Sequence, residues 1–135
     1  MEVRDAIEDD AARMAELTGA PASVMRELVH DRSTRVATVE SGTEAGANGG
    51  LAGVVSFDAR PDAIHVTRLA GTDEAVSRLL DEPIRFARRE DMAVEVLIEV
   101  ERTDLQEAVS EAGFERVGSG PRFEGQETVA FRLDP

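Results

Sequence analysis

The strongest constraint on the fold is a strand–helix–strand run in residues 64–100. Residues 64–69 (IHVTRL) and 94–100 (VEVLIEV) alternate apolar and polar side chains, as half-buried strands do. Thr72 or Asp73 predicts a helix start between them. The apolar residues of this helix recur at helical spacing and are Ala75, Val76, Leu79, Leu80, Ile84 and Ala87. A helical connection favours parallel pairing of the two strands, and Pro83 is expected to kink or split the helix.

Shorter elements flank this run on both sides. Strands are expected at residues 3–7, 35–40, 51–57, 114–117 and 128–133, and a polar loop at 41–50 joins two of them as an antiparallel pair. Further helices are expected at residues 11–18, after a cap at Ser23, and after a cap at Thr103 or Asp104. The order predicts a mixed α/β fold. Its mostly antiparallel, twisted sheet has about six or seven strands, with about four helices on both faces.

The composition indicates the cellular environment of the protein more clearly than its activity. The 135 residues predict a single domain spanning positions 1–135. All 15 basic residues are arginine, and they face 28 acidic residues for a net charge of −13, a pattern expected of a halophilic, salt-rich cytoplasm. Such acidity argues against nucleic-acid binding, and the lack of a long apolar run argues against a membrane span. With no cysteine and two histidines, no metal site is expected.

The order of elements, together with residues 105–118 (LQEAVSEAGFERVG), resembles the GCN5-related N-acetyltransferase (GNAT) superfamily. The resemblance extends over nearly the whole chain, and its most recognisable part is the helix–Gly–Phe–strand sequence around Gly113 and Phe114. Gly113 would end the helix in a left-handed conformation, and Phe114 would fill the core beneath the sheet. A helix that ends in glycine before an aromatic residue is also ordinary capping chemistry.

The resemblance implies a site for acetyl-CoA. In that family acyl-CoA lies between two parallel strands that splay apart, here residues 64–69 and 94–100, and its pyrophosphate lies on the N-terminus of the next helix. The implied contacts, mainly from the backbone, are Leu69, Ala70, Gly71, Thr72, Ala75 and Val76. The loop departs from the family pattern: Gly71 stands at the leading Gln or Arg, and Thr72, Glu74 and Val76 stand at small residues. The alternative is that residues 72–74 only cap the helix.

Candidate catalytic and substrate residues lie on the two strands. His65 is the candidate general base, because histidine titrates near neutrality; it would otherwise be a polar strand residue. Glu95 and Glu99 share one face and either receive a cationic amine or face solvent. The family's tyrosine acid falls at Val109, and the chain has no tyrosine.

Three functions stay open from the sequence. The first is an acyl-CoA-dependent N-acyltransferase of a small amine, located in the cytoplasm. The second is a non-catalytic GNAT-like module that binds a ligand or a protein partner, and the third is a structural subunit. The oligomeric state cannot be inferred from these residues.

Overall fold

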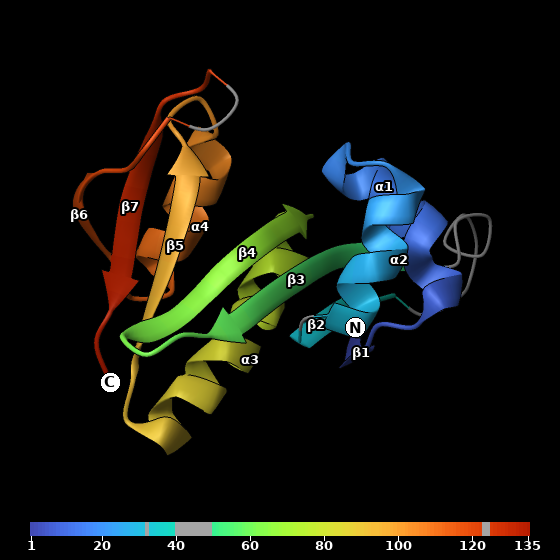
Figure 1. Ribbon diagram of the computed structural model, residues 1–135, viewed down its shortest axis with the longest axis horizontal. Coiled ribbons are helices and arrows are strands. Elements are labelled where there is room, and N and C mark those ends of the chain that lie inside the picture. The colour runs from blue at the N-terminus through green and yellow to red at the C-terminus, as the bar shows by residue number, and fades with distance from the viewer. Residues whose placement is uncertain (32, 40–49, 123–124) are drawn as a thin grey trace.

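The computed structural model contains one seven-stranded sheet in the order β1-β2-β3-β4-β5-β7-β6 (Figure 1). It describes residues 1–31, 33–39, 50–122 and 125–135. The strands are β1 (Glu2–Asp5), β2 (Ser33–Thr38), β3 (Leu51–Ala59), β4 (Ala63–Gly71), β5 (Ala93–Glu99), β6 (Glu115–Ser119) and β7 (Thr128–Leu133). The helices are the short 3-10 turn η1 (Glu8–Asp10), α1 (Ala11–Thr18), α2 (Ala22–Asp31), α3 (Asp73–Glu90) and α4 (Thr103–Glu111).

The sheet is mixed, as the sequence predicts. The pairing of β4 with β5 is parallel, and the other five pairings are antiparallel. The predicted loop at 41–50 lies outside the described residues except for Gly50, but the strands that it joins, β2 and β3, do pair antiparallel. The predicted fold class and order of elements are therefore confirmed.

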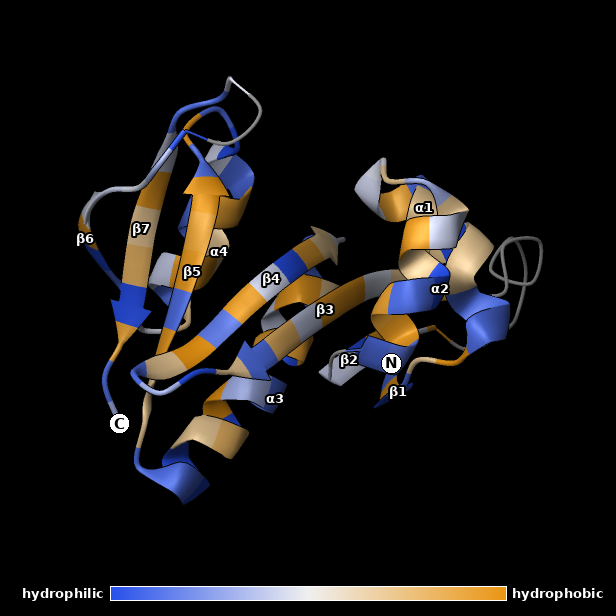
Figure 2. Ribbon diagram, in the orientation of Figure 1, coloured by the Kyte–Doolittle hydropathy of each residue, from blue (hydrophilic) through white to orange (hydrophobic). Residues whose placement is uncertain are grey.

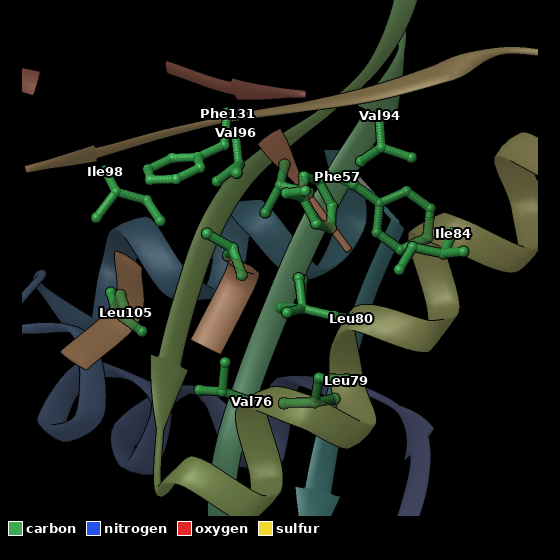
Figure 3. Close-up of a cluster of buried hydrophobic side chains, with 14 of the residues drawn as sticks. Phe57, Val76, Leu79, Leu80, Ile84, Val94, Val96, Ile98, Leu105 and Phe131 are labelled. Atoms are coloured by element: carbon green, nitrogen blue, oxygen red, sulfur yellow. The ribbon is translucent and has the colours of Figure 1, made fainter. Parts of the chain in front are cut away.

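Each face of the sheet packs against its own pair of helices. Along β2 and β3, Val36 and Val54 contact the cluster under α1 and α2, whereas Ala37 and Val55 contact the cluster under α3 and α4. This alternation is what the two-residue period of a strand requires. Along β4, apolar and polar residues alternate with the same period, which Figure 2 shows as stripes. Figure 3 shows the larger cluster, in which Leu79, Leu80 and Ile84 of α3 pack against Phe57 and the strand residues around it.

The helix–Gly–Phe–strand sequence folds as predicted. Gly113 has a φ of +105°, a conformation that favours glycine, directly after the last turn of α4. Phe114 is 4% exposed and belongs to the cluster under α3 and α4. Its backbone N–H donates to the carbonyl of Val109 at 3.0 Å, which closes the helix end.

Two predictions about helix caps are wrong, and a split at Pro83, one of the two outcomes predicted there, does not occur. Pro83 does not split α3, which runs unbroken through it; apolar residues buried on both sides of the proline hold the whole helix on the sheet. Ser23 does not precede α2, because the Pro21 carbonyl already accepts from the Val24 and Met25 amides at 3.1 Å. Neither candidate residue caps α4: Arg102 occupies that position without a side-chain cap.

Among the described residues, no helix is both long enough and apolar enough to cross a membrane.

Candidate functional site

A β-bulge in β4 sets the geometry of the site. Ser56 of β3 pairs with Arg68, but the next residue, Phe57, pairs with Val66, so Thr67 is an extra residue in β4. The Thr67 and Ser56 hydroxyl oxygens lie 2.6 Å apart, and this hydrogen bond links the bulge to β3. Bulges bend their strand and increase its twist, so β4 changes direction at Thr67.

The parallel pairing of β4 and β5 ends where the bulge begins. Val66 and Val96 form the last pair, after which β4 continues beside β3 and β5 continues beside β7. Figure 1 shows the two strands diverging toward their C-terminal ends. Beyond the bulge, every second residue of β4 directs its N–H and C=O away from β3, toward the side that β5 has left. Backbone groups in such a position need partners, which makes this divergence a candidate ligand site.

The residues predicted to contact the cofactor lie together where β4 ends and α3 begins, beyond the point at which β4 and β5 separate. Leu69, Ala70 and Gly71 form the last part of β4, Thr72 is the N-cap of α3, and Ala75 and Val76 are buried in its first turns. The Thr72 hydroxyl accepts from the Ala75 N–H at 3.2 Å, and its carbonyl accepts from the Val76 N–H at 2.9 Å.

The first turn of α3 combines free amides with acidic side chains. The first N–H groups of a helix, here at Asp73 and Glu74, have no acceptor within the helix. The Asp73 and Glu74 carboxylates lie in the same turn. The helix end therefore offers backbone donors for an anion beside two negative side chains.

Gly71 allows close packing that explains its departure from the family pattern. Its φ is +136°, and a Cβ at this position would overlap the carbonyl oxygen of Ala52 and lie 2.5 Å from the Cα of Gly53. A Cβ on Gly53 would in turn lie 2.8 Å from the Ala75 Cβ. The two glycines bring β3, the end of β4 and the start of α3 into contact, so glutamine or arginine at 71 would require the backbone to move.

A polar cluster crosses the sheet just before the bulge. His65 of β4 is in register with Glu95 of β5, and Glu95 is in register with Arg132 of β7. The His65 Nε2 lies 3.5 Å from Glu95 Oε1 and 3.7 Å from Asp62 Oδ1. On its other side, Glu95 Oε2 accepts from Arg132 Nη1 at 2.5 Å. The hydrogen bonds that the Arg132 guanidinium donates to Asp134 and to Glu95 raise its pKa, the bond to Asp134 more strongly.

The cluster combines predicted residues with two that the sequence did not indicate. His65 and Glu95 come together, whereas Glu99 lies at the far end of β5 opposite Thr128 and is exposed. Arg132 was missed because its place depends on the register of two strands far apart in the chain. Asp62 was missed although its position three residues before His65, across the turn, is a signal for proximity.

The position that corresponds to the family's tyrosine contributes no acid. Val109 is fully buried and packs in the cluster under α3 and α4. The neighbouring Ser110 is exposed on another face of α4. A proton donor for a leaving group must therefore come from elsewhere.

Comparisons with known proteins agree with this geometry. Neither a protein-family model nor a curated protein sequence matches the chain. Among solved structures, Ard1 from Thermoplasma volcanium has a TM-score of 0.79 at 13% identity, over 98% of this chain and 96% of that one. Arabidopsis thaliana NAA60 in complex with a bisubstrate analogue has a TM-score of 0.79 at 13% identity, over 98% and 97%. The NatC complex bound to Gag peptide and CoA has a TM-score of 0.74 at 16% identity, over 100% and 99%.

The chain has the GNAT acetyltransferase fold. At these identities the likeness establishes the fold alone. Within the GNAT fold, the divergence of β4 from β5 and the start of α3 are the places where the sequence led us to expect a cofactor.

Proposed function

We propose that the chain is an acyl-CoA-dependent N-acyltransferase that acts on a small amine, with His65 as its general base. The observation that carries the proposal is the bulge at Thr67, after which β4 and β5 separate directly beside the His65–Glu95 pair. Structures with the same fold have been determined with CoA and with a bisubstrate analogue bound.

The residues beyond the bulge suit the extended arm of acetyl-CoA. Within Leu69–Gly71, the backbone groups that face away from β3, those of Leu69 and Gly71, would bind its amides and polarise its thioester carbonyl. The free amides at the start of α3 would receive the pyrophosphate. The charges of Asp73 and Glu74 oppose an anionic ligand there, but in molar salt the Debye length is about 3 Å, so exposed charges repel weakly. Bound acetyl-CoA supplies an acetyl thioester, which a neutral amine converts to an amide with release of the thiol.

The polar cluster prepares the amine for that reaction. Glu95, with Glu99 further along the same strand, would attract a cationic amine to the partly exposed side of β5 on which both residues lie. The His65 imidazole then takes one proton from the ammonium group, which frees the nitrogen lone pair for attack. When the N–C bond forms and the C–S bond breaks, the proton released by the new amide nitrogen passes to the departing sulfur. No side-chain acid at Val109 is needed for this balance.

A non-catalytic binding module is the second candidate. The buried Val109 and the absence of a side chain at Gly71 favour it, since both positions lack groups that the family pattern supplies. The two functions differ in outcome, because a module would bind acetyl-CoA or a partner without transferring the acetyl group.

The test is acetyl transfer from acetyl-CoA to a panel of small primary amines in molar KCl. We expect His65→Gln to lower kcat by about a hundredfold or more, the usual contribution of a general base. His30→Gln is the matched control, because His30 is the other histidine of the chain. It lies in α2, outside the strands that form the site, and its Nε2 is 2.9 Å from Glu8 Oε2. An unchanged kcat in His65→Gln contradicts the base assignment. Binding of acetyl-CoA without transfer to any amine favours the module.

A further inference from the structure

Three potential metal ligands meet at the start of β4. One atom from each of Asp62, His65 and Glu95 lies within 4.8 Å of the other two. The His65 Nε2 is buried, and within the described ranges no hydrogen-bond partner reaches it. Its separations from Glu95 Oε1 and Asp62 Oδ1, 3.5 and 3.7 Å, are too long for hydrogen bonds. A buried nitrogen that faces two carboxylates without bonding to either is the arrangement that a bound cation would complete.

We propose that Asp62, His65 and Glu95 form a binding site for one Zn²⁺ ion. Zinc accepts imidazole nitrogen and carboxylate oxygen at about 2.0–2.1 Å in tetrahedral geometry, which places neighbouring ligand atoms about 3.4 Å apart. The two measured separations from His65 Nε2 are close to that value. Three protein ligands leave the fourth position to water. A nitrogen ligand favours zinc over magnesium, which prefers oxygen ligands alone.

The sheet holds two of the ligands in position. His65 and Glu95 are in register on neighbouring strands, and their side chains are 28% and 31% exposed. Arg132 binds Glu95 Oε2 and so turns Oε1 toward His65, the role that outer hydrogen bonds play around metal ligands. Asp62 lies in the turn before β4 with a side chain that is 68% exposed, so it can move the short distance that closes the site.

This site revises the expectation of no metal from the sequence. The two histidines are far apart along the chain, and a set of one histidine with two carboxylates becomes visible only when β5 lies beside β4. Zinc binding does not rest on the proposed function. One consequence does: because zinc would occupy the lone pair of His65 that serves as the base, Zn²⁺ should inhibit acetyl transfer.

The test is titration of the full, metal-free chain with ZnCl₂ in molar KCl, followed by calorimetry. The salt suppresses non-specific binding of cations to the acidic surface. We expect one Zn²⁺ per chain, loss of this binding in His65→Ala, and about tenfold weaker binding in Asp62→Asn. His30→Ala should bind zinc as the parent does, and MgCl₂ should give no comparable signal.

A second variant and a second readout test the proposal even if His65→Ala does not fold. Asp62 is on the surface, so Asp62→Asn should keep the parent's circular dichroism. Co²⁺ in the site should give the visible absorption of tetrahedral coordination, and Asp62→Asn should weaken it. The proposal is overturned if zinc does not bind, if His65→Ala binds it as tightly as the parent, or if His30→Ala loses it equally.

Discussion

At the scale of single residues, the best-defined electrostatic contact joins Arg4 to Asp10. Two guanidinium nitrogens of Arg4 each lie 2.9 Å from a carboxylate oxygen of Asp10, and the Ile7 N–H donates to the same carboxylate at 2.9 Å. Asp10 is 6% exposed. Burial alone would raise the pKa of Asp10, but the hydrogen bonds from Arg4 and Ile7 outweigh it and lower the pKa. The contact therefore ties β1 to η1 with a charge that must stay ionised.

This contact predicts a loss of stability in acid. Because the pKa of Asp10 is lower in the folded state, its contribution is fully present above the unfolded pKa of about 3.9 and disappears as pH falls through the folded pKa. Asp10→Asn should lower the free energy of unfolding by about 2 kcal/mol at pH 7. It should also flatten the dependence on pH below about pH 4. Urea denaturation at several pH values measures both effects.

Asp104→Asn is the matched control for that measurement. Asp104 also pairs with an arginine, Arg102, but the side chains are 53% and 45% exposed. Exposed ion pairs contribute about 0–1 kcal/mol, so this variant should remain close to the parent. Equal losses in the two variants would mean that burial of Asp10 adds nothing.

At the scale of elements, α3 is the best-predicted part of the chain. All six apolar residues expected to face inward, Ala75, Val76, Leu79, Leu80, Ile84 and Ala87, are buried. Its start at Thr72 was also among the predicted caps. Periodicity within one element is a local property, so the sequence carries it directly.

The Thr72 cap predicts a measurable contribution to stability. Thr72→Ala removes the acceptor of the Ala75 N–H and should lower the free energy of unfolding by about 1 kcal/mol. Thr103→Ala is the control: Thr103 lies at the start of α4, where Arg102 is the N-cap. It should change the free energy by less than about 0.5 kcal/mol. Thermal denaturation compares the two, and a larger loss in Thr103→Ala would contradict the assignment of the caps.

The candidate site was harder to predict from the sequence than α3 was. His65 and Glu95 could be proposed because each lies on a recognisable strand. The bulge at Thr67 could not, since it arises from the pairing of β3 with β4 and leaves no local pattern in residues 64–69. The Glu95–Arg132 contact depends in the same way on the register of β5 with β7. Long-range pairing decides these features, whereas the propensity of each strand does not.

At the scale of the whole molecule, two properties bear on the proposed acetyl-CoA site. They are the divergence of β4 from β5 and the net charge of the chain. The sheet consists of β1 to β4 on one side and β5 to β7 on the other, joined by parallel pairs that end at Val66 and Val96. The chain carries a net charge of −13, and acetyl-CoA is also an anion. In dilute buffer the two repel, whereas molar salt screens most of that repulsion. Binding must therefore be judged at high salt.

The most direct measurement is a calorimetric titration of the folded chain with acetyl-CoA in molar KCl, accompanied by NMR of its backbone amides. We predict saturable binding of one acetyl-CoA per chain. The largest amide shifts should fall in residues 69–76, at the end of β4 and the start of α3. If millimolar acetyl-CoA gives neither heat nor amide shifts while circular dichroism shows an intact fold, the proposed acetyl-CoA site is contradicted.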